Sequence, residues 1–179
     1  MAWSPSCIQA LGNSMPSRQH MFLYIVVGTL LATVAVLSRP VAAFQFSGSD
    51  FQCHSSSKKL ILQWVHSVEK EQWQEVYEIS GRQLLLTTTQ LKTFGAGTTS
   101  TQDIIPSDDG WLHFRVNRRL PRIHWVVSHD VQSTVVSTNG TWPLYQDLEN
   151  YAEVQVRITQ APRWRYVTKE SCDDNFHQA

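Results

Sequence analysis

A two-residue alternation of side chains recurs along most of this chain and constrains its fold more than any other feature. In residues 60–67, one side of the alternation is formed by Leu60, Leu62, Trp64 and His66. Successive side chains of a β-strand point to opposite faces, so this period predicts a strand with one buried face. The chain is therefore expected to build its core from sheets rather than from helices.

The same period returns after regularly spaced turn residues. Further strands are predicted over 75–79, 83–91, 111–116, 123–127, 133–138, 141–145, 153–158 and 163–166. Asn139-Gly140 is the strongest hairpin signal, because both residues tolerate the positive φ angles of a type I′ turn. The one helical candidate in this part is Ser67–Gln74, with one or two turns. This pattern predicts an all-β fold, a single sandwich or barrel-like domain of about eight short antiparallel strands.

An apolar segment precedes the predicted strands. Residues 21–37 carry no charge, and Arg18 and Arg39 flank them. Such a run spans roughly 26 Å as a helix, which is short for a hydrocarbon core of about 30 Å and typical of a signal peptide. We predict cleavage after Ala43, giving a leader over 1–43, a β domain over 44–170 and a disordered tail over 171–179. An uncleaved membrane anchor at 21–37 is the alternative, and either one places the domain outside the cytoplasm.

Composition limits the function classes. Hydrophobic residues make up 42% of the chain and charged residues 17%, which is enough apolar material for a core and excludes disorder of the whole. The 15 basic and 15 acidic residues cancel. Bulk charge therefore gives no reason to expect a nucleic-acid partner.

Cys53 and Cys172 lie near the two ends of the predicted β domain. In an oxidising compartment they could form one disulfide that joins the termini of the domain. Two free thiols are the competing interpretation, and a metal site made by two such distant cysteines is the weakest.

Two short motifs stand out among the strands. Residues 64–70 read Trp-Val-His-Ser-Val-Glu-Lys, and residues 94–97 read Phe-Gly-Ala-Gly. Glycine permits close backbone approach, and its exposed N–H groups can bind an anion. The candidate site is a polar cluster that converges on this loop and comprises His66, Ser67, Glu69, Lys70, Glu75, Tyr77, Phe94, Gly95 and Gly97. The structural alternative is a histidine at the edge of the core followed by a solvated charged turn.

From about residue 59 to residue 159 the chain resembles a bacterial family of exported proteins of unknown function. The resemblance is carried by the motifs at 66–70 and 94–97, with Glu75-Val76-Tyr77, Asp109-Gly110-Trp111 and a closing strand at 154–158. It implies a periplasmic protein associated with TRAP-type transporters that use TAXI-class solute receptors. This chain departs from the family pattern after Lys70, where it has Glu71, Gln72 and Trp73. The family brings no established catalytic residues.

The sequence offers little for catalysis. Ser67 and His66 are adjacent, so strand geometry would point their side chains to opposite faces and prevent a nucleophile-base pair. The chain contains no nucleophile elbow, no His-Glu-x-x-His segment and no phosphate loop. A metal at His66 and Glu69 would need a third ligand that the sequence does not place. We expect no cofactor, no metal and no enzymatic activity, with a glycosidase-like carboxylate pair left open.

Four arginines fall within residues 115–122. Arg118 and Arg119 are expected to lie exposed at a turn, where the planar guanidinium can bind carboxylates in a bidentate manner. They would form a docking patch for an acidic receptor surface or for a small carboxylate ligand. The simpler interpretation is a solvated turn paired with Asp108 and Asp109.

Two functional hypotheses follow. The first is a non-catalytic periplasmic accessory module whose partner is a TRAP transporter membrane subunit or a TAXI-class solute receptor. The second is a stand-alone periplasmic domain that binds or hydrolyses a small ligand between His66 and Gly97. A pocket walled by His66, Glu69 and Phe94 would favour the second hypothesis.

Overall fold

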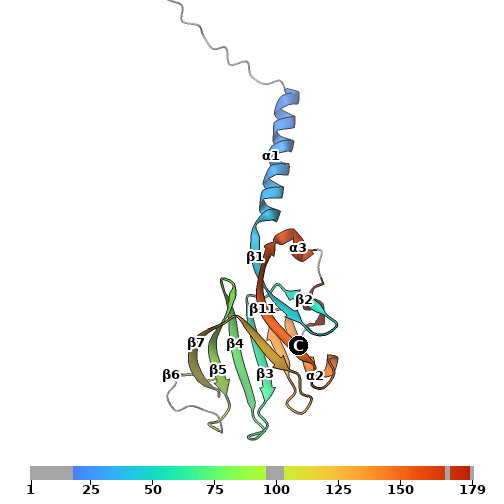
Figure 1. The fold of residues 1–179 in the computed structure, drawn as a ribbon. Coiled ribbons are helices and arrows are strands. Elements are labelled where there is room, and N and C mark those ends of the chain that lie inside the picture. Colours follow the sequence, from blue (N-terminus) through green and yellow to red (C-terminus); the bar gives the residue numbers. More distant parts are fainter. Residues whose placement is uncertain (1–17, 96–102, 168–169, 178–179) are drawn as a thin grey trace, which may run out of the picture. The chain divides into compact units, whose positions relative to one another are not determined.

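The computed structural model describes residues 18–95, 103–167 and 170–177. The chain divides into two compact units, Met1–Leu37 and Ser38–Ala179 (Figure 1). Gly97, one of the candidate site residues, lies outside the described residues.

The first unit contributes one helix, α1 (Arg18–Ser38), which is longer than the apolar run that predicted it. Its 21 residues correspond to about 31 Å, which matches a hydrocarbon core of about 30 Å. The hydroxyl groups of Thr29 and Thr33 donate to the carbonyls of Val26 and Thr29 at 2.9 Å, so both are satisfied within the helix. Among the described residues α1 is the one helix long and apolar enough to cross a membrane, and a signal segment has the same properties.

The second unit is a sandwich of two antiparallel sheets, as the sequence predicted (Figure 1). The four-stranded sheet has the order β2-β1-β11-β8, with β1 (Pro40–Ser47), β2 (Gln52–Ser55), β8 (Arg122–Val126) and β11 (Glu153–Pro162). The seven-stranded sheet has the order β10-β9-β3-β4-β5-β7-β6. Its strands are β3 (Lys59–Val65), β4 (Gln72–Ser80), β5 (Gln83–Leu91), β6 (Asp103–Ile105), β7 (Leu112–Leu120), β9 (Thr134–Ser137) and β10 (Gly140–Trp142).

Three predicted elements differ from the structure. The helical candidate Ser67–Gln74 is a tight turn followed by the start of β4, because Gln72 and its successors pair with β3. The predicted strand 141–145 is split into β10 and a short helix, α2 (Leu144–Asp147). The predicted last strand 163–166 is helix α3 (Arg163–Val167), which follows directly on the long strand β11.

The core lies between the two sheets. Phe44 and Phe46 of β1 are fully buried and belong to one cluster with Leu60 and Leu62 of β3. The ring of Trp142 packs edge-on against Phe46 at a centroid distance of 5.5 Å. The chain crosses from the first sheet to the second between β2 and β3 and again between β8 and β9. It returns between β7 and β8, where Pro121 is the single connecting residue, and between β10 and β11.

Strand β1 begins inside the segment that the sequence analysis assigned to the leader. Pairing with β11 starts at Pro40, which lies opposite Pro162, and Ala43 is buried opposite Thr159. Cleavage after Ala43 remains a prediction. It would remove the first four residues of an eight-residue strand and their pairing with β11.

The end of the chain is ordered rather than disordered over the residues that the structure describes. Cys172 is bonded to Cys53 of β2, at an S–S distance of 2.04 Å, and begins the 3₁₀ helix η1 (Cys172–Asn175). Phe176 is buried in the core, and the amide of His177 donates to the carbonyl of Thr141 at 2.9 Å. These contacts together hold the segment against β2 and β10. They could not be predicted from the polar composition of the segment, which is typical of a disordered tail.

Candidate functional site

The first motif forms the turn between β3 and β4. The amide of Lys70 donates to the carbonyl of His66 at 2.9 Å, and the amide of His66 donates to the carbonyl of Glu71 at 2.8 Å. Lys70 closes the turn with a φ of 59°, in the left-handed region that few non-glycine residues adopt. This geometry leaves Ser67, Val68 and Lys70 exposed while His66 and Glu69 are partly buried.

The two motifs meet at the side chain of Glu69. Its carboxylate contacts Nδ1 of His66, and the two side chains are 17% and 20% exposed, respectively. The imidazole of His66 stacks on the indole of Trp73 at 4.3 Å with an interplanar angle of 18°. A Cβ atom on Gly95 would lie 2.5 Å from Cδ and 2.6 Å from Cγ of Glu69, so a larger residue at this position would require the Glu69 side chain to move. We call the set of His66, Glu69 and Gly95 the loop clasp.

The loop clasp lies beside a group of exposed apolar side chains. Val68 is 69% exposed, Phe94 60% and Ile104 53%. The ring of Phe94 packs edge-on against Phe114 at 5.8 Å, and Ile104 of β6 pairs with the same Phe114 of β7. We call Val68, Phe94 and Ile104 the motif surface. It lies at the end of the seven-stranded sheet where β3 and β5 finish (Figure 1).

Glu75 and Tyr77 form a separate pair on β4. The hydroxyl of Tyr77 donates to the carboxylate of Glu75 at 2.5 Å. Burial, reinforced by the neighbouring Glu75 charge, raises the pKa of Tyr77 far above its usual range, although the positive charge of Arg118 acts in the opposite direction. Tyr77 is therefore a protonated hydrogen-bond donor inside the sandwich. The hydrogen bond of this pair is made within β4 and involves none of the three residues of the loop clasp.

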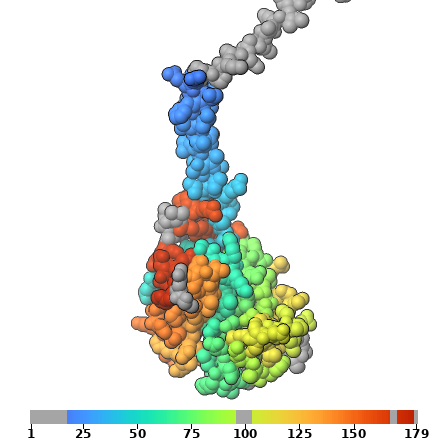
Figure 2. All heavy atoms as spheres, turned by 180° about the vertical axis from the view of Figure 1, so that it is seen from behind, coloured from blue at the N-terminus to red at the C-terminus, as the bar shows by residue number. Residues whose placement is uncertain are grey.

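Arg118 and Arg119 are exposed as expected, but they lie within strand β7 and not at a turn. Arg118 is opposite Leu86 and Arg119 is opposite Leu85, so their side chains leave opposite faces of the sheet. A bulge at Asn117, which has a φ of 51°, precedes them. The two arginines therefore do not form one patch. Figure 2 shows residues around 110–120, in yellow, at the surface on the opposite side from Figure 1.

The acidic partner expected for these arginines has another role. The carboxylate of Asp109 lies 2.9 Å from Nε2 of His113, whose other ring nitrogen is 3.1 Å from the side-chain amide of Gln90. A hydrogen bond with the Ser107 side chain is the largest influence on the pKa of Asp109 and lowers it. Nearby, the ammonium group of Lys92 lies 4.0 Å from the ring centre of Trp111. The sequence analysis did not anticipate either contact. The first is local and joins the turn before β7 to β7 itself, and the second brings together the residue after β5 and the residue before β7.

The site shows no catalytic arrangement among the described residues. Ser67 points into solvent from the turn, and no group of three or more histidine, cysteine, aspartate and glutamate side chains gathers to hold a metal ion in this part of the chain. Three pockets stand out in the described structure, and His66, Glu69 and Phe94 line none of them. Glu69 fills the space between the two motifs that a ligand would need.

A protein-family model described as a domain of unknown function (DUF1850) matches residues 60–144. This segment begins in β3, contains both motifs and ends at the start of α2. Residues 60–144 are thus similar to the DUF1850 family. The match confirms the resemblance to a family of unknown function and carries no link to TRAP-type transporters, so that partner stays a prediction. Strands β1, β2 and β11 lie outside the DUF1850 match although they complete its sandwich. No curated protein and no solved structure matches the chain significantly.

Proposed function

We propose that this protein is a non-catalytic interaction module, anchored in the inner membrane by α1, that displays the motif surface to a protein partner in the periplasm. The observation that carries the proposal is the exposure of Val68, Phe94 and Ile104 beside loops held by a partly buried polar contact. Neighbouring exposed apolar side chains at one end of a domain are typical of a docking site. The loop clasp would keep this surface in a fixed shape and so lower the entropy cost of binding.

The anchor is supported by the length of α1 and by the position of β1. A helix of 21 residues is long enough to cross a membrane. Only Arg39 separates it from Pro40, the first residue of β1. Cleavage at Ala43 would cost the domain half of a paired strand, whereas retention of α1 keeps that strand whole.

The proposed partner is a TRAP transporter membrane subunit or its TAXI-class solute receptor. This choice rests on the family resemblance of the two motifs. A helix long enough to cross a membrane also suits a partner that resides in or at the membrane.

A ligand-binding or hydrolytic site between His66 and Gly97 is a weaker candidate. Glu69 occupies the space beside Gly95, and the ring of Phe94 packs against Phe114. The stacking of His66 on Trp73 gives the histidine a packing role.

Co-purification of the full chain from its own membranes tests the proposal. Val68→Ser and Phe94→Ser should each lower the recovery of the partner at least tenfold. Val68→Ser should leave the melting temperature unchanged, because Val68 is 69% exposed, whereas Phe94→Ser should lower it slightly through loss of the edge contact with Phe114. Tyr151→Ser is the matched control, since Tyr151 is 69% exposed and precedes β11 in the other sheet. Equal recovery with all three variants would contradict the proposal, and a transporter subunit or solute receptor among the recovered proteins would support the named partner.

A further inference from the structure

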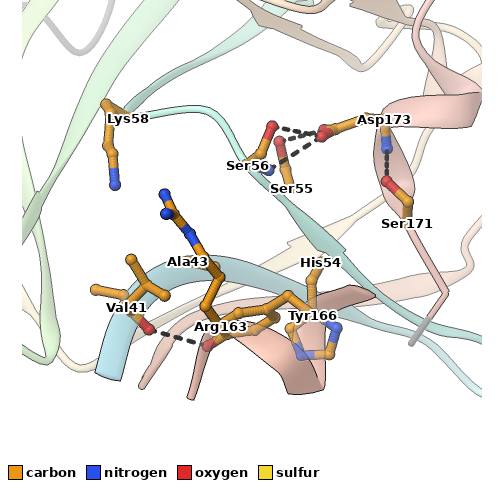
Figure 3. A pocket seen from close by; sticks show the side chains of 11 residues that line it. Val41, Ala43, His54, Ser55, Ser56, Lys58, Arg163, Tyr166, Ser171 and Asp173 are labelled. Atoms are coloured by element: carbon orange, nitrogen blue, oxygen red, sulfur yellow. Dashed lines mark hydrogen bonds between the residues drawn. The ribbon is translucent and has the colours of Figure 1, made fainter. Parts of the chain in front are cut away.

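A pocket of about 250 Å³ lies on a part of the domain that the DUF1850 match does not cover (Figure 3). Its walls come from β1, from β2 and the loop after it, from α3 and from the segment that starts η1. The disulfide between Cys53 and Cys172 joins two of these elements next to the lining residues His54 and Asp173. The pocket is thus built by both ends of the domain, and a covalent bond fixes one side of it.

Two cationic side chains from different elements point into this space. Lys58 follows β2 and Arg163 begins α3, and Figure 3 shows the end of each side chain directed toward the same opening. Neither one forms a salt bridge with any residue in the described ranges. Both therefore retain donors for an added ligand.

Asp173 is the acidic residue of the pocket, and its oxygens already have donors. Oδ1 accepts from the hydroxyl of Ser55 at 2.7 Å, and Oδ2 accepts from the hydroxyl and the amide of Ser56 at 2.6 and 3.1 Å. Burial acts to raise the pKa of Asp173, but these hydrogen bonds and one from Asn139 outweigh it and leave the pKa below its usual value. The carboxylate of Asp173 thus holds η1 on β2 and is not paired with Lys58 or Arg163. The pocket lining therefore carries two positive charges and one negative charge.

The rest of the wall is apolar. Val41 and Ala43 of β1 present short aliphatic side chains to the pocket. The ring of Tyr166 lies beside them and packs on His54 at a centroid distance of 5.2 Å. Its hydroxyl is engaged with the carbonyls of Val41 and Thr159 at 3.3 and 3.2 Å, so the ring presents mainly its carbon face.

We propose that this pocket binds a small amphiphilic oxyanion, with the anionic group between Lys58 and Arg163 and a short aliphatic body against Val41, Ala43 and Tyr166. The guanidinium fork of Arg163 suits two oxygens of one carboxylate or phosphate, and Lys58 adds a mobile positive charge. The volume suits a metabolite-sized molecule or the polar end of a lipid, since pockets for drug-sized ligands begin near 300 Å³. This site does not depend on the motif surface.

The test uses the full chain in phosphatidylcholine nanodiscs, with hexyl phosphate, hexanoate and inorganic phosphate as probes in calorimetric titrations. Hexyl phosphate or hexanoate should bind more tightly than inorganic phosphate. Arg163→Gln and Lys58→Gln should each weaken that binding by roughly tenfold to a hundredfold, the range for a lost charge-assisted hydrogen bond. Arg122→Gln, an exposed arginine of β8 outside the pocket, should bind like the wild type.

A second arm distinguishes the two sources of the anion. Nanodiscs that contain phosphatidylglycerol should weaken hexyl phosphate binding if lipid headgroups occupy the pocket and should leave it unchanged if the ligand is soluble. Either result supports the site. The proposal would be overturned if neither alkyl probe binds at millimolar concentration, if inorganic phosphate binds as tightly as they do, or if the two pocket variants bind like Arg122→Gln. Melting temperatures without probe confirm that each variant is folded.

Discussion

Gly95→Ala should destabilise the wild type but stabilise a variant in which Glu69 is replaced by alanine. The φ angle of Gly95 is outside the left-handed region, so alanine fits the backbone and should stabilise the fold by about 0.4–1 kcal/mol through the unfolded state. In the wild type the added methyl group would meet Glu69 at 2.5–2.6 Å and displace its carboxylate from His66. Loss of that partly buried contact costs about 1–2 kcal/mol. The net effect is a destabilisation of roughly 0.5 kcal/mol.

In a Glu69→Ala background the added methyl group meets no carboxylate. Only the stabilisation that comes from restricting the unfolded chain then remains. Urea unfolding of the wild type, both single variants and the double variant measures the coupling, which should be about 1–2 kcal/mol. Additivity within about 0.3–0.5 kcal/mol would refute the idea that Gly95 acts through Glu69. Gly81→Ala is a control for the method, because its φ of 64° disfavours alanine in both backgrounds while its surroundings are open.

Four further outcomes are expected. Ellman titration of the denatured, unreduced protein should show neither Cys53 nor Cys172 as a thiol, and Cys53→Ser with Cys172→Ser should cost about 4–5 kcal/mol, given a sequence separation of 119 residues. The chain should stay in the membrane pellet after alkaline extraction with its N-terminus intact, and a soluble protein that starts at Phe44 would show cleavage instead. A domain over 44–179 should be less stable than one over 39–179 by about 2 kcal/mol, because it lacks pairing and the Tyr166 contact to Val41. Folding lowers the pKa of Asp173, so the ionised carboxylate stabilises the folded protein above the unfolded pKa of about 3.9. This stabilisation is lost as the pH falls through the folded pKa of Asp173. Asp173→Asn should therefore make the stability of the protein less dependent on pH in the acid range.

Most of the fold was predictable because strand period and turn chemistry are local. Asn139-Gly140 marked the β9–β10 hairpin, and the alternation over 60–67 marked β3 with its buried face. The predictions were wrong where tertiary contacts determine the secondary structure. Arg163-Trp164-Arg165-Tyr166 alternates like a strand, yet it forms a helix whose Tyr166 hydroxyl contacts the carbonyls of β1 and β11.

The site was predictable only in part. The sequence indicated that His66, Glu69 and the glycine loop belong together, and in the structure Glu69 touches both His66 and Gly95. It could not show that Glu75 and Tyr77 form their own pair within β4, since the distance from that strand to the loops that hold His66, Glu69 and Gly95 depends on packing. The pocket at Lys58 and Arg163 had no sequence signal at all, because its walls are far apart along the chain.

Photocrosslinking in intact membranes tests whether the motif surface binds a protein partner. Benzoylphenylalanine placed at Phe94 keeps an aromatic ring at the motif surface, and the same residue at Tyr151 gives an equally exposed reference. We expect a discrete crosslinked species from position 94, identified by mass spectrometry as a membrane-bound or periplasmic protein, and none from position 151. A crosslink pattern that is the same at both positions, or absent at position 94 while the protein is folded and membrane-bound, would contradict this expectation.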